Sequence, residues 1–458
     1  MQGRRVAAQG ELFVRTPEVP QTPARSLLRR IDELVDLDFV RELSAFRFAK
    51  GGRPSLDPVV MVKMMLVGCL FGIESDRRLV EECADRLSFR EFIGYSLSES
   101  LPVHSSFTHW RQRLGSAFFR EVLHEIARQC VALGIELSRA RTVDATSVKA
   151  QADLNGRLIE VPAGEEIDEF VDGYFAGEGP VIGGVGKGVK AISVHDPEAR
   201  LQKKPGEVRA FRYQASFSAD ADTGIITDAT ATPTERPETA VDHVKHDPGE
   251  VRELAADSRY DSSDTLAALQ ARGVTPYVPK TKRDKPGQIS RDAFTYDEAS
   301  NSYTCPAGKR LEEYRYEEPR GIHSYAPKHS DCRDCPLKDR CTKAKRRKVT
   351  RTHNQAARES TVRKGWRYRQ LSRRRKVNEH LNLLAKRDHG MRRARGLGLD
   401  SVRIQAALVA TAIDLKKLVR LLGRCGPVAL AARLHRALAT AIGRIEPQRR
   451  PLLGSRPI

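Results

Sequence analysis

The chain has 458 residues, 40% of them hydrophobic, so it can bury a substantial core and is expected to be folded. It carries 79 Lys and Arg against 59 Asp and Glu, a net charge of +20, which favours a polyanionic partner such as nucleic acid. No apolar stretch is long enough to span a membrane, and no apolar segment follows the first basic residues as in a secretory signal, so a membrane partner is excluded and a cytoplasmic protein is expected.

The amino-terminal part of the chain is predicted to be helical. Residues 1–25 are rich in Pro and Arg and are expected to form a flexible arm. Residues 26–135 have apolar side chains at helical spacing, which predicts an all-α domain. Asp57 and Pro58 have the residue types of a helix N-cap and of the first helical position.

One predicted helix of this domain has the composition of a DNA-reading helix. Ser105 and Ser106 fall at its start, and Arg111 and Arg113 follow one to two turns later. The pattern predicts that these two arginines contact DNA. A bundle that only dimerises explains the same pattern equally well.

Residues 136–280 are predicted to form the first part of a catalytic core with mixed α/β structure. The predicted elements are a strand over residues 142–148, a hairpin of residues 211–217 and 225–232, a helix over residues 264–271 and a short strand over residues 275–278. Strands that alternate with a helix in this way indicate a mixed α/β core.

Residues 281–354 are charged and loop-like, and they are predicted to be a basic insertion that holds a cysteine cluster. The cluster consists of Cys305, Cys332, Cys335 and Cys341. In a reducing compartment, clustered cysteines favour a metal over disulfides, and four thiolates can close a tetrahedral structural Zn²⁺ site. Free thiols are the alternative.

Basic and aromatic side chains in the second half of the chain are candidates for nucleic-acid contacts. Lys345, Arg346 and Arg347 follow the last clustered cysteine and are predicted to contact DNA, with a solvated run of charges as the alternative. Tyr260 and Trp366 have flat faces on which a flipped base can stack, although core packing is the default expectation for both.

The pattern becomes helical again over residues 355–442, which are predicted to complete the core, before a tail at residues 443–458. At about 100° per residue, Arg375, Glu379 and Lys386 share one helix face. A carboxylate between two cations can bind a divalent metal while the bases hold a phosphodiester. The alternative is a surface ion pair worth about 0.2–0.5 kcal/mol.

Two further acidic residues lie at predicted strands. Asp144 falls inside an apolar strand, where a carboxylate costs desolvation energy unless it binds a metal or, as the alternative, a loop amide. Asp257 follows a strand where a helix begins, the edge at which α/β sheets bind ligands. An N-cap is the alternative for Asp257, but Ser258, Asp261 and Ser262 could each take that role.

Three sequence segments together resemble the DDE transposases of bacterial insertion sequences, in the branch related to the IS-four and IS-five families. They are residues 142–146 around Asp144, residues 256–262 around Asp257, and the pattern Arg375-x3-Glu379-x6-Lys386. Residues 53–58 and 195–200 resemble the amino-terminal domain and the core of the same branch.

The resemblance implies an α/β fold with an RNase H-like mixed-sheet core, an N-terminal all-α domain, a cysteine-containing insertion and a C-terminal helical segment. It also implies that Asp144, Asp257 and Glu379 hold Mg²⁺ or Mn²⁺, and that Arg375 and Lys386 contact DNA. Two carboxylate-bound ions would stabilise the attacking and leaving oxygens of a phosphodiester displacement.

The function implied is cleavage of DNA strands at the ends of a mobile element and their transfer into target DNA, by a homodimer that pairs two terminal inverted repeats. A transposase-derived DNA-binding regulator without strand transfer and a structure-specific nuclease on the same core are the alternatives. The sequence departs from the branch at Ser372, where a Tyr is common, at Asn378, and at Leu381 or Leu383, near which an aromatic is common.

Overall fold

The computed structural model describes residues 26–48, 55–161, 190–203, 206–234, 236–281, 287–318 and 321–423, together with residues 23, 167, 181 and 182. The predicted arm over residues 1–25 lies almost wholly outside these ranges, and the predicted tail lies entirely outside them. The chain forms two compact units: unit 1 is residues 1–235, 243–251 and 374–458, and unit 2 is residues 236–242 and 252–373. The domain boundaries read from the sequence stay predictions.

Unit 1 begins with helices, as the apolar spacing predicts. They are α1 (Leu27–Leu34), α2 (Phe39–Ser44), the 3-10 turn η1 (Ala45–Arg47), α3 (Pro58–Leu70), α4 (Asp76–Asp85), α5 (Leu87–Ile93) and α6 (Ser105–Ala132). The predicted cap is confirmed, because the Asp57 carboxylate accepts the backbone N–H of Val59 at 2.9 Å and Pro58 is the first residue of α3. Nearly every α3 side chain is buried, so this apolar helix is core rather than membrane span.

Helix α6 is interrupted at Gly115, whose φ of 72° and ψ of 168° are not helical. Glycine adopts a positive φ without the clash that a Cβ would cause. The second half of α6 therefore begins at Ser116, and its backbone N–H is accepted by the Asp400 carboxylate at 3.3 Å. The kink separates the half of α6 with Arg111 and Arg113 from the half that begins at Ser116, and both halves bury side chains in the core.

The main strands of unit 1 form an antiparallel arrangement around β6. The strands are β1 (Ala140–Lys149), β2 (Leu158–Glu160), β3 (Val181–Ile182), β4 (Ala191–Ser193), β5 (Arg200–Gln202), β6 (Ala210–Asp220) and β7 (Ile226–Thr232). Strand β1 pairs with one edge of β6, and β5 and β7 pair with the other edge. Strands β3, β2 and β4 form a separate small sheet. The predicted hairpin is confirmed as β6 and β7.

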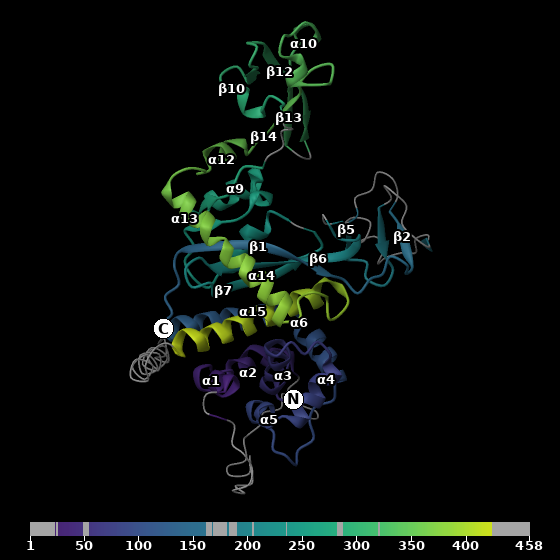
Figure 1. Cartoon of the computed structure of the whole chain (residues 1–458), viewed down its shortest axis with the longest axis vertical. Coiled ribbons are helices and arrows are strands. Elements are labelled where there is room, and N and C mark those ends of the chain that lie inside the picture. Colours follow the sequence, from purple (N-terminus) through teal and green to yellow (C-terminus); the bar gives the residue numbers. More distant parts are fainter. Residues whose placement is uncertain are drawn as a thin grey trace, which may run out of the picture. The chain divides into compact units, whose positions relative to one another are not determined.

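Two helices after the sheet complete unit 1: α14 (Lys376–Asp388) and α15 (Gly398–Gly423). Helix α15 runs beside α6 and covers β7 (Figure 1). One continuous apolar cluster joins the amino-terminal helices, β6, β7 and α15, with side chains such as Phe119, Phe217 and Leu415 almost fully excluded from solvent. Helix α14 contacts β1 and β6.

Unit 2 contains a parallel strand pair and a five-stranded antiparallel sheet. The pair is β8 (Glu253–Ala255) and β9 (Thr275–Tyr277), linked by the 3-10 turn η2 (Ser258–Tyr260) and α9 (Ser263–Gln270). The sheet has the order β10 (Thr295–Asp297), β11 (Ser302–Thr304), β12 (Arg310–Glu317), β13 (Ile322–Ala326) and β14 (Val349–Thr352). The remaining elements are η3 (Arg291–Ala293), α10 (His329–Arg333), α11 (Lys338–Cys341) and α12 (Gln355–Ser360). The units divide within α8 (Thr239–His246) and α13 (Trp366–Arg374).

The prediction that residues 281–354 are loop-like was wrong, because most of the sheet β10–β14 lies there. Strand β12 shows why the pattern failed: only Leu311 is buried in a strand that otherwise consists of charged residues and tyrosines. A sheet that buries so few side chains leaves little apolar alternation to detect. The mixed α/β class is confirmed for the molecule. Among the described helices, none is long and apolar enough to cross a membrane.

Candidate active site

Asp144 lies in the middle of β1, opposite Phe217 of β6 in the strand register. Its side chain is partly exposed, whereas Val143 before it is buried. The Asp144 Oδ2 atom accepts a hydrogen bond of 2.9 Å from the Asn382 amide of α14. The carboxylate is therefore held by a side-chain amide of a helix, whereas the sequence had left open a metal or a loop amide.

Glu379 lies in the first turn of α14 and is exposed. Within the described residues it forms no hydrogen bond and no ion pair, so the surface pair with Arg375 that the spacing allowed is absent. An unpaired carboxylate at a helix N-terminus is also stabilised by the helix dipole. The side chain is free to bind a cation from solution.

Asn382 of α14 links Asp144 of strand β1 to the helical turn that carries Glu379. Asn382, which holds Asp144, follows Glu379 by three residues, and side chains at this spacing are neighbours on a helix surface, about 5–6 Å apart at Cβ. The strand acid, distant in the chain, is thus bonded to a residue one helical turn from Glu379.

Asp257 follows β8 in unit 2 and takes the capping role given as its alternative. Its Oδ1 accepts the Arg259 backbone N–H at 2.9 Å, and its Oδ2 is 3.5 Å from the Arg259 Nε. The side chain keeps 22% of its surface exposed, so capping does not bury it. Its approach to Asp144 and Glu379 stays a prediction. Within the described ranges, no group of three or more His, Cys, Asp and Glu side chains is arranged to hold a metal ion.

A second acid in unit 1 has the same sequence signal as Asp144 and a different role. Asp228 lies inside β7 and is completely buried, between Arg120, His124 and His243. The Arg120 Nε donates to it at 2.6 Å, and nitrogens of His124 and His243 lie 2.9 and 2.6 Å from its oxygens. Burial alone would raise the pKa of this carboxyl, but these hydrogen bonds hold it well below its usual range.

This cluster was not predicted from the sequence, although a carboxylate inside an apolar strand was the available signal. Ser216 extends it, because its Oγ lies 2.8 Å from His243 Nε2. Ser216, His243 and Asp228 repeat the hydrogen-bond order of a hydrolase triad, yet each side chain is at most 2% exposed. A nucleophile without access to substrate cannot act, so the cluster is structural.

The arginines predicted on α6 are engaged within unit 1. Arg111 forms a two-pronged ion pair with Asp76 of α4, at 2.7 and 2.6 Å. Arg113 is exposed, and its guanidinium lies 5.4 Å from the centre of the Phe48 ring. Arg113 can still meet a phosphate from this position, whereas Arg111 would first have to leave Asp76.

The three basic residues predicted to contact DNA in unit 2 also include one exposed side chain and two that contact other residues of the unit. Lys345 is exposed, but Arg346 stacks on Tyr314 and Arg347 donates to the Cys341 carbonyl at 3.2 Å. The aromatic expectations also divide. Tyr260 is buried as expected, whereas the expected burial of Trp366 was wrong, since it is 69% exposed at the start of α13.

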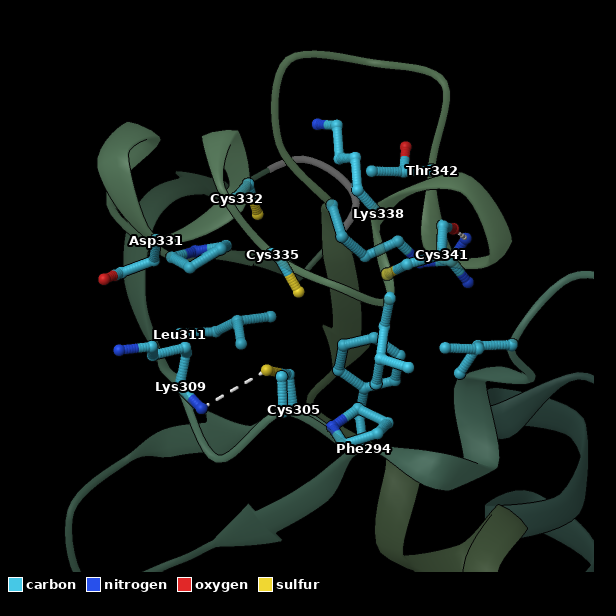
Figure 2. Close-up of a pocket in the computed structure, with 16 residues that line it drawn as sticks. Phe294, Cys305, Lys309, Leu311, Asp331, Cys332, Cys335, Lys338, Cys341 and Thr342 are labelled. Atoms are coloured by element: carbon cyan, nitrogen blue, oxygen red, sulfur yellow. Dashed lines mark hydrogen bonds between the residues drawn. The ribbon is translucent and has the colours of Figure 1, made fainter.

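The four clustered cysteines line one pocket of unit 2 (Figure 2). Cys305 follows β11, Cys332 lies in α10, Cys335 follows α10 and Cys341 ends α11. None of the four forms a disulfide. The turn after Cys305 folds back so that the Lys309 backbone N–H points at its sulfur, 3.3 Å away.

The pKa of the Cys341 thiol depends on the charges of the other groups that line the pocket. Burial raises the pKa of Cys341, the nearby Arg347 lowers it, and the other three cysteines raise it further. Thiolates that repel one another in this way are stabilised together by a cation. The donor set therefore suits zinc, although the side-chain positions in this structure do not yet close around an ion.

Two segments of the chain match family models of transposases. Residues 19–113 match a model described as Transposase domain (DUF772), and residues 304–419 match a model described as Transposase DDE domain. The first covers most of the amino-terminal helices, and the second covers the cysteine pocket and Glu379. These matches support a transposase of the DDE type. The bacterial origin and the branch stay predictions.

Comparisons with individual proteins add little. No curated protein matched the chain. One matching solved structure is titled "Cryo-EM structure of piggyBac transposase synaptic complex with hairpin DNA (SNHP)"; it shares 12% identity over 93% of this chain and 84% of that chain, with a TM-score of 0.33. A likeness at that TM-score carries no argument about this chain.

Proposed function

We propose that the protein is a DDE transposase that cleaves DNA strands at the ends of a mobile element and joins them to target DNA. The observation that carries the proposal is the hydrogen bond from Asn382 to Asp144, which links the strand acid to the turn of α14 that carries Glu379, within a chain that matches a Transposase DDE domain. Asp257 would supply the third carboxylate from an RNase H-like core.

The three carboxylates would hold Mg²⁺ or Mn²⁺, since these hard cations prefer oxygen ligands. The ions supply Lewis-acid stabilisation of the charge that develops on the attacking and leaving oxygens. The chain's own part is to present the acids on rigid elements. Asp144 lies on a strand paired along its length with β6, and Glu379 lies on a helix packed against that strand.

Basic side chains near the acids would hold the phosphodiester. Arg375 precedes α14, and its side chain forms no hydrogen bond or ion pair with the described residues; Lys386 lies two turns after Glu379 on the same helix. Arg113, Lys345 and the exposed Trp366 are further candidates for contact with the duplex. The net charge of +20 favours binding to double-stranded DNA, and pairing of two ends favours a homodimer.

The test is strand cleavage and joining on a duplex that carries the inverted repeats flanking the coding region, with Mg²⁺. Asp144→Asn, Asp257→Asn and Glu379→Gln should each lose activity on the order of 10³-fold, since bound metal supplies several kcal/mol of charge stabilisation. Asp388→Asn is the matched control, an acid of the same helix that pairs with Arg387. Normal cleavage by the Glu379 variant would show that the assignment is wrong.

The same assay separates the alternatives. A regulator derived from a transposase would bind the repeats without cutting them, and a structure-specific nuclease would cut without joining. The unpaired Glu379 favours an active enzyme over the regulator, because a surface acid amid bases weakens DNA binding unless it has another use.

We also propose that the four cysteines of the pocket bind one structural Zn²⁺. Four thiols, from the turn after β11, from α10, from the segment after α10 and from the end of α11, line the same pocket, and the Cys305 sulfur already accepts a backbone N–H. Rotation of the side chains would complete a tetrahedral site.

A further inference from the structure

Helix α14 carries two asparagines that contact the strands β1 and β6 next to Asp144. Asn378 and Asn382 are one turn apart on the face that packs against the sheet, and Asn378 is only 1% exposed. Asn382 donates to the Asp144 Oδ2 at 2.9 Å, and Asn378 donates a long hydrogen bond of 3.5 Å to the Phe217 carbonyl. Asp144 and Phe217 are partners in the β1–β6 register. The two amides thus hold one cross-strand pair.

Burying these two asparagines destabilises the fold, which indicates that they have a function other than stabilising the core. The Oδ1 atoms of Asn378 and Asn382 are both buried and have no hydrogen-bond partner among the described residues. A buried amide oxygen without a partner costs about 1–3 kcal/mol. Leucine would fill the same space without that cost, and the helix already has Leu381 and Ala385 buried beside it.

The backbone at Asp144 is fixed from the opposite side as well. The Ser216 hydroxyl lies 3.5 Å from the Asp144 carbonyl oxygen, and Ser216 is anchored by His243 and through it by Asp228. With the main chain held in this way, contacts to the side chain decide the rotation of the Asp144 carboxylate. The Asn382 amide acts on that rotation directly.

We propose that Asn382 is a positioning residue for the metal site: it turns the Asp144 carboxylate toward the Glu379 turn of α14. The proposal rests on the proposed function. A neutral donor suits this role, because it occupies one of about four lone-pair sites of the carboxylate and does not itself neutralise the negative charge. An arginine or lysine at the same place would compete with the cation for that charge.

The experiment measures Mn²⁺ binding to the full chain by the loss of the free-ion electron paramagnetic resonance signal, beside Mg²⁺-dependent cleavage. Asn382→Leu keeps the size of the side chain and removes the donor. It should raise the Mn²⁺ dissociation constant about 10- to 100-fold, the usual range for partners of metal ligands. Cleavage should recover in part at high metal concentration. Leu383→Ala, at the next and exposed position, is the control and should bind Mn²⁺ as the wild type does.

The outcomes separate this proposal from the one on which it rests. If Asp144→Asn keeps wild-type Mn²⁺ affinity and cleavage, the proposed function fails. If Asp144→Asn loses Mn²⁺ while Asn382→Leu binds it as the wild type does, only the role of Asn382 is overturned. Should Asn382→Leu not fold, Asn382→Ser decides by the same criterion, because its hydroxyl is too short to reach the carboxylate.

Discussion

Unit 1 buries a large apolar cluster, whereas the β10–β14 sheet of unit 2 buries a small one. In unit 1 one continuous cluster joins six helices, the β6–β7 hairpin and α15. The β10–β14 sheet buries one small cluster: Phe294, Tyr303, Leu311, Tyr325 and Val349. Cys305 and Cys341 pack against that cluster, at the place where the cysteine pocket begins.

The difference shows how each region is stabilised. Burial contributes roughly 25 cal/mol per Å² of apolar surface, so the unit 1 cluster can carry its own fold. A module of fewer than about 70 residues with so small a core usually needs a cross-link or a metal. We therefore expect unit 1 to depend on packing and buried polar pairs, and the β10–β14 sheet to depend on the thiols.

Removal of zinc should give the largest effect, and only in unit 2. The purified protein should contain about one zinc per chain, and Cys332→Ser or a strong chelator should destabilise the sheet by more than about 5 kcal/mol, since structural zinc binds with about 10–16 kcal/mol. The near-ultraviolet circular dichroism of three tyrosines in mutual ring contact, Tyr296, Tyr303 and Tyr325, reports on the sheet directly.

The control for zinc is Cys83→Ser, a buried thiol of α4 in unit 1. It should leave zinc content and the tyrosine signal unchanged. If the wild-type protein contains no zinc and its tyrosine signal does not respond to a chelator, the β10–β14 sheet does not depend on a metal for its stability.

Asp228→Asn should give the next largest effect, and in unit 1. The substitution leaves Arg120, His124 and His243 without their buried carboxylate, and loss of one partner of a buried pair costs about 3–5 kcal/mol. Urea denaturation followed by circular dichroism measures the free energy of unfolding. Asp222→Asn, which breaks an exposed pair with Arg374, should cost less than about 1 kcal/mol. Equal costs for the two variants would contradict the assignment.

The smallest expected effect is a pH dependence that originates at Asp414 of α15. This carboxyl is completely buried, and burial raises its pKa to about 8. Between its ordinary pKa and that value, the folded chain keeps a proton that the unfolded chain releases, so stability falls as pH rises. Partly buried Lys417, whose pKa is lowered by desolvation, opposes part of this trend.

Asp414→Asn keeps the side-chain oxygen that accepts the Ile226 N–H and removes the titration. The stability of the variant relative to wild type should therefore rise between pH 6 and pH 8, on the order of 1–2 kcal/mol. Urea melts at the two pH values measure this difference. Parallel pH profiles would show that Asp414 is not the source.

Local patterns predicted the elements that depend on nearby residues. The cap at Asp57, the hairpin and the strand that contains Asp144 were found because capping, turns and alternation are set within a few residues. The sheet β10–β14 was missed because its strands bury too few side chains to give a period. The capping of η2 by Asp257 was underestimated, since its sequence neighbours offered equivalent side chains.

Asp144 and Asp228 show which properties of a residue the sequence determines and which depend on the tertiary structure. Each is a carboxylate inside an apolar strand, so the sequence alone determined that both need a partner. Only the fold decided that Asp228 is buried among an arginine and two histidines, whereas Asp144 stays partly exposed and accepts a hydrogen bond from the Asn382 amide. Periodicity is a property of adjacent residues, but burial and charge pairing are set by side chains that folding brings from far along the chain.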